Sequence, residues 1–487
     1  MARWRVFWAR EGVTASSERV RRLIGREGLA TGAASVEIRP GDPIMLSPDY
    51  RVDPVLSRFL CRSGFSRLAQ ETKRNYTDDY RVFFDFLWAR GKNWCDADAD
   101  DLWDFEDWRT RSSRNPGRIG GARWNRGLAA LTRLYGWALS AGVVARSPVV
   151  TRSVRGRFGG QVQVAEARIA HARTSNVHWL TPRAFRLWVD VGLRGHDAYG
   201  VPSSVWRGRL ESRNTAFAEF LFSSGVRLAE GGSLLTIEMP RLRLDAGGFY
   251  PGRLAREVTK SKRARTFYVA APVVAAVEGY AESSRAAAVR RAQALGRYER
   301  LPVRRVVTAV TGLRERVLHW RDQDNQLGRT PLASASVAER MTMFREGQEG
   351  LEPLWLWLNE SGLPLRPASW ENVFRAASQR CVDVLQGRMT EPPVCTPHMC
   401  RHSFALHMLV VLHYVVDRRM GLSAEERRDF RLLYGDVWRM VQDLLGTRRW
   451  RRPGRSTWRP CPICGCGRCW PTRARPTLDS VHPRRTG

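Results

Sequence analysis

Lysine is scarce in this chain of 487 residues, and long apolar runs are missing from it. Only four of the 80 basic residues are lysines: Lys73, Lys92, Lys260 and Lys262. No run reaches the roughly 18 apolar residues that a membrane-spanning helix needs. The first residues mix arginine with tryptophan and lack the apolar core of a secretory signal. We therefore expect a cytoplasmic protein with reduced thiols and no membrane contact.

Acidic residues are also few relative to basic ones. The chain has 48 Asp and Glu against 80 Lys and Arg, which gives a net charge of +32 and a pI near 11.1. A GC-rich coding sequence would favour arginine over lysine, but it would not favour basic over acidic residues. The excess positive charge therefore predicts a polyanionic partner, of which nucleic acid is the most common.

Four of the nine cysteines crowd into residues 461–469, and the other five are scattered without a pairing pattern. The crowded cysteines have the spacing C-x2-C-x-C-x2-C, which suggests a zinc site. Known zinc sites separate two cysteine pairs by about a dozen residues or more, so that a loop can close one tetrahedron. The short gap here fits poorly, and we predict neither a bound metal nor a cofactor.

Helical patterns and changes in composition divide the chain into segments. In chain order we predict a basic, irregular lead-in (1–51), a compact helical domain (52–150), a polar linker (151–178), a second domain (179–446) and a tail without periodicity (447–487). The main β signal of the second domain lies at 242–271, and residues 273–350 are expected to be helical again. The predicted fold class is mainly α with a small β-sheet (α+β).

Three short motifs of the second domain carry cationic or imidazole side chains, and a fourth ends a helix. "SGVRLAE" places Arg227 after a glycine turn and at the start of a helix, and "VTKSKRARTFYV" predicts a hairpin with Lys260 at the start of its turn. "TPHMCRHSFALHML" places His398 and Arg401 three residues apart on one helix, and "VQDLLG" is a helix that ends at Gly446. Each motif alone is weak evidence for a function, but the four motifs in this order form a specific pattern.

In this order, behind a helical domain containing "TKRNYTDDYRVFFDFL" and "WNRGLAALTRLYGWA", the motifs resemble the phage-integrase (tyrosine recombinase) family. The resemblance covers about 52–446. It implies a helical core-binding domain of the SAM-like type joined to an integrase catalytic domain, the pair forming a C-shaped clamp around double-stranded DNA. It also implies site-specific recombination or integration of a mobile element without a cofactor, by a homo-oligomer that works as a tetramer on paired sites.

The resemblance assigns a role to each motif residue. Arg227 and Arg401 would clamp the non-bridging oxygens of the scissile phosphate, because guanidinium groups bind phosphate bidentately and stay charged. His398 would orient the phosphate or share the nucleophile's proton, and Lys260 would protonate the leaving 5′ oxygen. Lys262 is the alternative if the hairpin register differs by two residues.

Structural roles are the alternative for the same residues. Arg227 could be a solvated helix start, and His398 could cap its helix after Pro397. We interpret Glu230 as a residue that orients Arg227 through an i,i+3 contact. The remaining histidines of this helix (His402, His407 and His413) are interpreted as structural or surface residues.

The family's nucleophile is missing. The family places a tyrosine beyond "LLGH" to form a covalent 3′-phosphotyrosine, but this chain reads Leu445-Gly446-Thr447 and has no tyrosine after Gly446. Tyr414 and Tyr434 are the nearest candidates for a nucleophile, and both precede the end of the "VQDLLG" helix at Gly446. We therefore expect DNA binding without strand cleavage.

The tail is compatible with a change of reading frame at Gly446. Residues 447–487 hold eleven arginines and one acidic residue, which contributes +10 to the net charge. With permitted synonymous codons, the DNA for residues 447–458, started one base earlier, encodes His-Ala-Ser-Val-Glu-Thr-Thr-Arg-Ser-Ile-Tyr-Leu. That is the family's "LLGH…Y" ending, so the tail is predicted to be an out-of-frame, disordered segment.

Three other functions remain open at this stage. A type IB topoisomerase shares the Arg, Lys, His and Tyr set, although the helical domain at 52–150 argues against it. A DNA-binding regulatory or architectural protein would use the clamp without chemistry. The chain could also be the nonfunctional product of a pseudogene.

The nucleotide sequence across codons 446–458 tests the reading-frame hypothesis. We expect the DNA, read one base earlier from the third base of codon 446, to encode a tyrosine across codons 456 and 457. An alternate frame that lacks this tyrosine would contradict the hypothesis.

Overall fold

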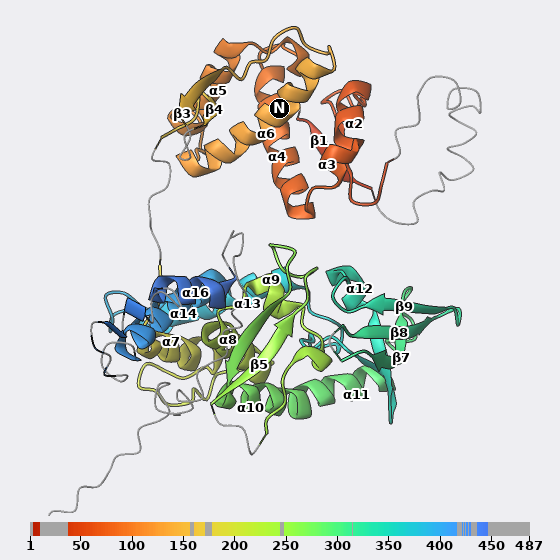
Figure 1. The fold of residues 1–487 in the computed structure, drawn as a ribbon, viewed down its shortest axis with the longest axis vertical. Helices are drawn as coiled ribbons and strands as arrows, with labels where there is room; N and C mark the ends of the chain where they lie inside the picture. The colour runs from red at the N-terminus through yellow and green to blue at the C-terminus, as the bar shows by residue number, and fades with distance from the viewer. Residues whose placement is uncertain are drawn as a thin grey trace, which may run out of the picture. The chain divides into compact units, whose positions relative to one another are not determined.

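The computed structural model describes residues 3–9, 38–155, 160–170, 178–243, 248–313, 315–415 and 436–446, with 421, 423, 425–426 and 428–429 between the last two ranges. The chain forms two compact units, Met1–Asn176 and Val177–Gly487 (Figure 1). Both are mainly helical and carry small sheets, which confirms the predicted fold class. No helix in these ranges has the length and apolar composition needed to cross a bilayer.

The first unit is a helical bundle with two short hairpins. Its elements are β1 (Arg5–Trp8), β2 (Pro43–Leu46), α2 (Pro54–Cys61), α3 (Ser63–Ser66), α4 (Gln70–Trp88), η1 (Trp94–Asp96), α5 (Ala99–Thr110), α6 (Gly121–Ser140), β3 (Thr151–Arg155) and β4 (Gln161–Ala165). Helix α4 buries Tyr80, Phe83 and Leu87 at helical spacing against α6. The Tyr80 hydroxyl donates to the Ala130 carbonyl of α6 at 3.0 Å, so the phenol is satisfied inside the core.

The lead-in predicted at 1–51 is not irregular throughout. Strands β1 and β2 pair antiparallel, and the side chains of Trp4 and Met45 are buried in the same core as α4. The Trp4 amide donates to the Asp85 carboxylate of α4 at 2.7 Å. Lys73 of α4 forms an ion pair of 3.1 Å with Asp42, and both side chains are buried. The prediction was wrong here because these partners lie far away in the sequence.

The segment predicted as a linker at 151–178 is also partly structured. Strands β3 and β4 form a hairpin over 151–165. The chain then returns to the bundle, where the Trp124 indole of α6 donates to the Ala167 carbonyl at 2.7 Å. Asn125 exchanges two hydrogen bonds with the backbone of Ile169. Residues up to Ile169 therefore belong to the first unit.

The second unit has three groups of elements. Its first half contains α7 (Pro182–Trp188), η2 (Val189–Leu193), α8 (Glu211–Ser224), α9 (Leu228–Gly232), η3 (Thr236–Glu238), β5 (Phe249–Leu254), β6 (Arg265–Ala270), α10 (Ala271–Tyr280), η4 (Ala281–Arg285) and α11 (Ala286–Ala294). Strands β7 (Arg305–Thr311), β8 (Val317–Asp322) and β9 (Leu327–Pro331), helix α12 (Val337–Met341) and strands β10 (Met343–Gly347) and β11 (Gly350–Pro353) follow. The last elements are η5 (Pro367–Ser369), α13 (Trp370–Leu385), α14 (Pro397–Tyr414) and α16 (Val437–Leu445).

The β content of the second unit exceeds the prediction. The hairpin β5–β6 was predicted and is present. In the structure Phe249 lies opposite Ala270, and Leu254 lies opposite Arg265. Helices were expected over 273–350, but strands between residues 305 and 353 form a five-stranded sheet in the order β11-β10-β7-β8-β9. Figure 1 labels three of these strands, β7, β8 and β9. Strand β10 pairs parallel with β7, and the remaining pairs are antiparallel. These strands are short and partly buried on both faces, so they lack the alternation that marks a strand.

The buried pair of Lys73 and Asp42 predicts a large difference between two lysines of the first unit. In Lys73→Met, Asp42 keeps its charge without its cationic partner, which should cost about 3–5 kcal/mol of unfolding free energy. Lys92 is the control, because its own side chain is 39% exposed and water can replace its amine beside Asp98 and Asp101. We expect Lys92→Met to have little effect on the denaturation midpoint of the first unit. Hydrogen exchange of α4 peptides at increasing denaturant concentration measures this midpoint for both variants. Equal effects of the two substitutions would contradict the role assigned to the buried pair.

Candidate active site

The turn between α8 and α9 positions Arg227. Gly225 ends α8 with φ +62°, and a Cβ there would lie 2.3 Å from a ring carbon of Phe404 in α14, so only glycine fits. Arg227 is the N-cap of α9, as predicted. Its guanidinium donates to Glu230 at 2.8 Å, and its amide donates to the other Glu230 oxygen at 2.9 Å. The i,i+3 contact predicted for Glu230 is thus present.

Helix α14 carries His398 and Arg401. Thr396 is the N-cap, with its hydroxyl accepting from the Met399 amide at 3.2 Å, so the capping role considered for His398 belongs to Thr396. Arg401 is buried, and its guanidinium donates to the Gly225 carbonyl and, at 2.7 Å, to the Leu445 carbonyl. Helix α14 is thereby joined to the turn that carries Arg227.

The hairpin β5–β6 presents its two lysines differently. Lys262 has φ +52° and donates to the backbone carbonyl and the carboxylate of Glu257. Lys260 is exposed, and its amine has no hydrogen-bond or ion-pair partner among the described residues. Lys260, and not Lys262, is among the charges that act on His398. The geometry therefore favours Lys260 over the alternative Lys262 for a role at this site.

Arg265 at the start of β6 belongs to the same cluster, although the sequence analysis assigned it no role. It donates to Glu230 at 2.6 Å and to the Leu444 carbonyl at 3.1 Å. The Glu230 carboxylate is 1% exposed and lies between two arginines, Arg227 and Arg265. The only sequence signal was the position of Arg265, five residues after Lys260 and on the strand that leaves the hairpin turn.

The C-terminal end of α16 meets this cluster. The carbonyls of Leu444 and Leu445 accept hydrogen bonds from Arg265 and Arg401, which places two cations at the negative end of the helix. Gly446 follows with φ +63°, and a Cβ there would lie 2.5 Å from Cδ of Arg265. The C-terminal end of α16 therefore lies beside the arginines.

The electrostatics of the cluster follow from burial and from its excess of cations. Burial lowers the pKa of His398, and the charges of His402, Arg401, Arg227 and Lys260 lower it further. Burial, with Arg227 and Arg265, lowers the pKa of Arg401 to about 10, which leaves it protonated near neutral pH. Burial alone would raise the pKa of Glu230, but Arg265 and Arg227 hold it below its ordinary value. The cluster combines a neutral imidazole with three guanidinium groups, an arrangement suited to an anionic ligand.

His402 is a second neighbour to which the sequence analysis gave no catalytic role. Its ring lies 4.3 Å from that of His398 between centroids, at an interplanar angle of 78°. The two histidines are one helical turn apart, so the i,i+4 spacing was the available signal. Burial and the charge of Arg401 lower the pKa of His402.

Tyr414 lies too far along the helix to act with this cluster. It ends α14 and is 61% exposed, thirteen residues after Arg401, which corresponds to about 20 Å along the helix axis. Tyr434, the cysteine cluster and the whole tail at 447–487 lie outside the described residues. The described ranges contain no group of three or more His, Cys, Asp or Glu side chains that could hold a metal ion.

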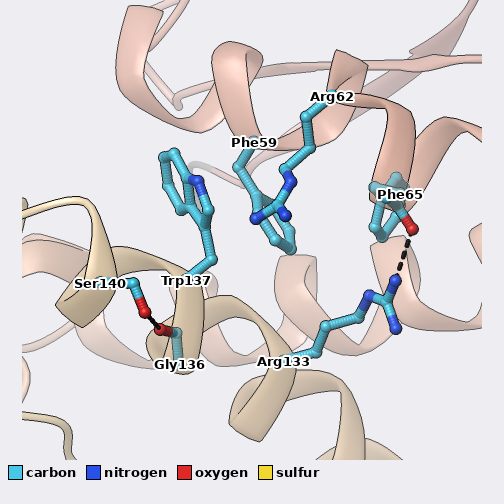
Figure 2. A pocket seen from close by; sticks show the side chains of 8 residues that line it. Phe59, Arg62, Phe65, Arg133, Gly136, Trp137 and Ser140 are labelled. Carbon is cyan, nitrogen blue, oxygen red and sulfur yellow. Dashed lines mark hydrogen bonds between the residues drawn. The ribbon is translucent and has the colours of Figure 1, made fainter.

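A hollow in the first unit has a different character (Figure 2). It lies between α2, α3 and α6 and is lined by Phe59, Arg62, Arg133 and Trp137 among others. The Arg133 guanidinium donates to the Gly64 carbonyl, and the Ser140 hydroxyl donates to Gly136 at 2.7 Å. No carboxylate, thiol or imidazole lines it. It therefore lacks general acid–base groups, unlike the cluster of the second unit.

Comparison with known proteins concerns the first unit most directly. Residues 65–142 match the model of the phage integrase N-terminal SAM-like domain. This stretch lies within the helical domain predicted at 52–150, and the resemblance to the phage-integrase (tyrosine recombinase) family is confirmed for it. No curated protein matches the chain.

Three solved structures are similar to this chain at low identity. The XerH site-specific recombinase bound to difH substrate, in a pre-cleavage complex, is 14% identical with a TM-score of 0.36 over 80% of this chain and 76% of that one. The Tn1549 transposon integrase in complex with circular intermediate DNA is 11% identical, with a TM-score of 0.37 over 80% and 93% of the two chains. XerA recombinase is 13% identical, with a TM-score of 0.24 over 80% and 92%. The family assignment rests on residues 65–142.

The cations around His398 predict a measurable coupling. Its pKa should lie below 6.5, and Arg227→Gln should raise it, because one positive charge that disfavours the imidazolium is removed. His398 remains buried in this variant, so its pKa should stay below 6.5. NMR titration of histidine Cε1–H signals measures the shift, with the signal assigned by its loss in His398→Asn. Arg375→Gln on α13 is the control and should leave this pKa unchanged; a His398 pKa that ignores Arg227→Gln would disprove the coupling.

Proposed function

We propose that this chain is a tyrosine-recombinase-type protein that binds double-stranded DNA and holds a target phosphate in the cluster of Arg227, Lys260, His398 and Arg401. We further propose that the chain as written does not cleave DNA, because it has no tyrosine after Gly446, where the family places its nucleophile. The observation that carries the proposal is the convergence of three arginines and a neutral histidine around the end of α16.

The phosphate role is supported by the donors that the arginines retain. A guanidinium has five N–H groups. The hydrogen bonds described for Arg401 use donors on its two terminal nitrogens, and those described for Arg227 use one terminal nitrogen. The rest can turn to the non-bridging oxygens of a phosphate, where charge accumulates during phosphoryl transfer. Glu230 keeps Arg227 in place and is itself neutralised by Arg265.

The proton-transfer roles follow from the type of side chain. Lys260 is exposed at a hairpin turn, and an ammonium can donate its proton to a leaving oxygen, which a guanidinium cannot do readily. His398 is held neutral by burial and by the surrounding cations, so it can accept a proton or a hydrogen bond near neutral pH. Together with Arg227 and Arg401, these two residues would form the phosphate-binding and proton-transfer half of a transesterification site.

The partner is inferred from charge and from the first unit. A net charge of +32 strongly favours association with a polyanion. Residues 65–142 match the phage integrase N-terminal SAM-like domain. We propose duplex DNA as the partner of this chain, and a homo-oligomer in relatives with an intact C-terminal segment.

The missing nucleophile separates binding from cleavage. Tyr414 is remote from Arg401 on the same helix, and the chain has no tyrosine after Gly446. The contacts of Arg265 and Arg401 with α16 go to backbone carbonyls, so within the described residues these contacts do not require a particular side chain at the end of the helix. A DNA-binding protein without strand transfer is therefore the expected behaviour of this chain.

The absence of cleavage is tested by trapping covalent adducts. The duplex should be one selected from a random-sequence pool by the full chain, and denaturing gels would report a shifted, protease-sensitive band. We expect none for the natural chain. We expect adducts after residues 447–458 are replaced by the frame-shifted sequence, and their loss when the tyrosine of that segment becomes phenylalanine. Adducts formed by the natural chain and abolished by Tyr434→Phe would overturn the cleavage-inactive assignment.

The clamp is tested in the same frame-restored protein. Arg227→Gln should lower the rate of adduct formation by about 100- to 1000-fold, because one donor to the developing phosphate charge is lost. Arg183→Gln, an exposed arginine on α7, is the control for charge and should leave the rate nearly unchanged. Lys262→Met should leave the rate of adduct formation nearly unchanged, whereas Lys260→Met should lower it. The reverse result would assign the role of general acid to Lys262.

A further inference from the structure

The hairpin β3–β4 differs from the other described sheets because none of its strand residues has a buried side chain. None of its ten strand residues is buried, and most are exposed, including Val162 at 51%. A two-stranded ribbon with no second layer is marginally stable in water. Figure 1 shows it at the margin of the first unit.

The base of the ribbon is nevertheless held firmly. The Glu166 amide donates to the Val150 carbonyl at 2.9 Å, which closes the hairpin where it joins the bundle. Val149 and Ala167 on either side are buried in the core of the first unit. The hydrogen bonds of Trp124 and Asn125 described above fix the return strand to α6. The ribbon therefore projects from a rigid support.

The two faces of the ribbon differ in chemistry. In the antiparallel register, Thr151 lies opposite Ala165, Ser153 opposite Gln163 and Arg155 opposite Gln161, so these side chains share one face. The other face carries Arg152, Val154, Val162 and Val164. The first face is thus almost entirely polar and holds donors and acceptors in a row. The Ser153 hydroxyl donates to the Gln161 side-chain oxygen at 3.0 Å, which leaves the Gln161 amide group as a donor.

The charge of the ribbon has one sign. Residues 151–165 contain Arg152, Arg155 and Arg157 and no acidic residue. A ribbon of this charge is suited to a polyanion and poorly suited to pair with an identical copy of itself. A two-stranded ribbon fits the major groove of B-form DNA, which is about 12 Å wide. Five residues per strand span about 17 Å, the rise of roughly five base pairs.

We propose that the β3–β4 ribbon enters the major groove of duplex DNA and reads base edges with its polar face. Arg155 would bind guanine, and Gln161 and Gln163 would bind adenine, because these side chains match the groove edges of those bases. The valine face points away from the bases. Arg152, on that face, contributes charge but no base recognition. The inference rests on the proposed function, since it names the surface that selects the DNA sequence.

Two substitutions on the same strand separate the recognition of bases from the electrostatic attraction to DNA. Arg155→Ala and Arg152→Ala remove the same side chain from exposed positions on opposite faces, so each controls for the other. Gln161→Ala with Gln163→Ala alters the polar face without changing charge. The full chain and these variants would be used to select duplexes from a random-sequence pool, followed by deep sequencing and by binding titrations on the enriched duplex. Thermal unfolding curves that coincide with that of the natural chain would show that each variant is folded.

We expect the natural chain to enrich a defined sequence. Arg155→Ala should lose the preference for guanine at one position by about tenfold or more, and the glutamine variant should lose preference at adjacent positions. Arg152→Ala should enrich the same sequence and weaken binding uniformly. Methylation of guanine N7 at the affected position should block binding of the natural chain and have little effect on Arg155→Ala.

The contrary outcomes are distinct. If the variants enrich the same sequence with the same preferences, or if only minor-groove modification interferes, the ribbon proposal is overturned and DNA binding stands. Binding of duplex without enrichment of any sequence also overturns the ribbon proposal alone. If the natural chain retains no duplex, the proposed function fails together with it.

Discussion

The candidate site depends on one buried carboxylate. Glu230 is 1% exposed, and a charged side chain so deeply buried is stable only when cations compensate it. Arg227 supplies one from the N-cap of α9, and Arg265 supplies the other from β6. Because Arg265 also binds the Leu444 carbonyl, the same carboxylate indirectly fixes the hairpin with Lys260 and the end of α16. Removing Glu230 would leave the arginines to repel one another beside Arg401.

Local parts of this arrangement could be predicted from the sequence, and long-range partners could not. The glycine turn before Arg227, the hairpin around Lys260 and the helix with His398 and Arg401 are each encoded within about a dozen neighbouring residues, and the structure forms all of them. The membership of Arg265 depends on contacts with residues 35 and 179 positions away, for which a single sequence holds no signal. The roles of these residues in catalysis remain a proposal.

The same distinction explains the errors in the fold. The lead-in and the linker were misjudged because their few apolar residues, such as Trp4 and Ala167, are buried by helices distant in sequence. The five-stranded sheet was not predicted, because β10 pairs in parallel with β7 although β8, β9 and α12 lie between them in the sequence. In addition, Met343 and Phe344 are adjacent and both buried. Adjacent buried residues break the alternation on which strand prediction depends. Tertiary burial, rather than local propensity, determines these segments.

The contacts at the end of α16 join the arginine cluster to backbone atoms of that helix. Arg401 and Arg265 bind carbonyl oxygens of Leu445 and Leu444, and backbone groups are present whatever side chains follow. Gly446 supplies the left-handed conformation that ends the helix and gives room to Arg265. Every contact described for the arginine cluster therefore ends at or before residue 446. The proposed separation of phosphate binding from nucleophilic attack rests on these backbone contacts, which the described residues up to 446 supply by themselves.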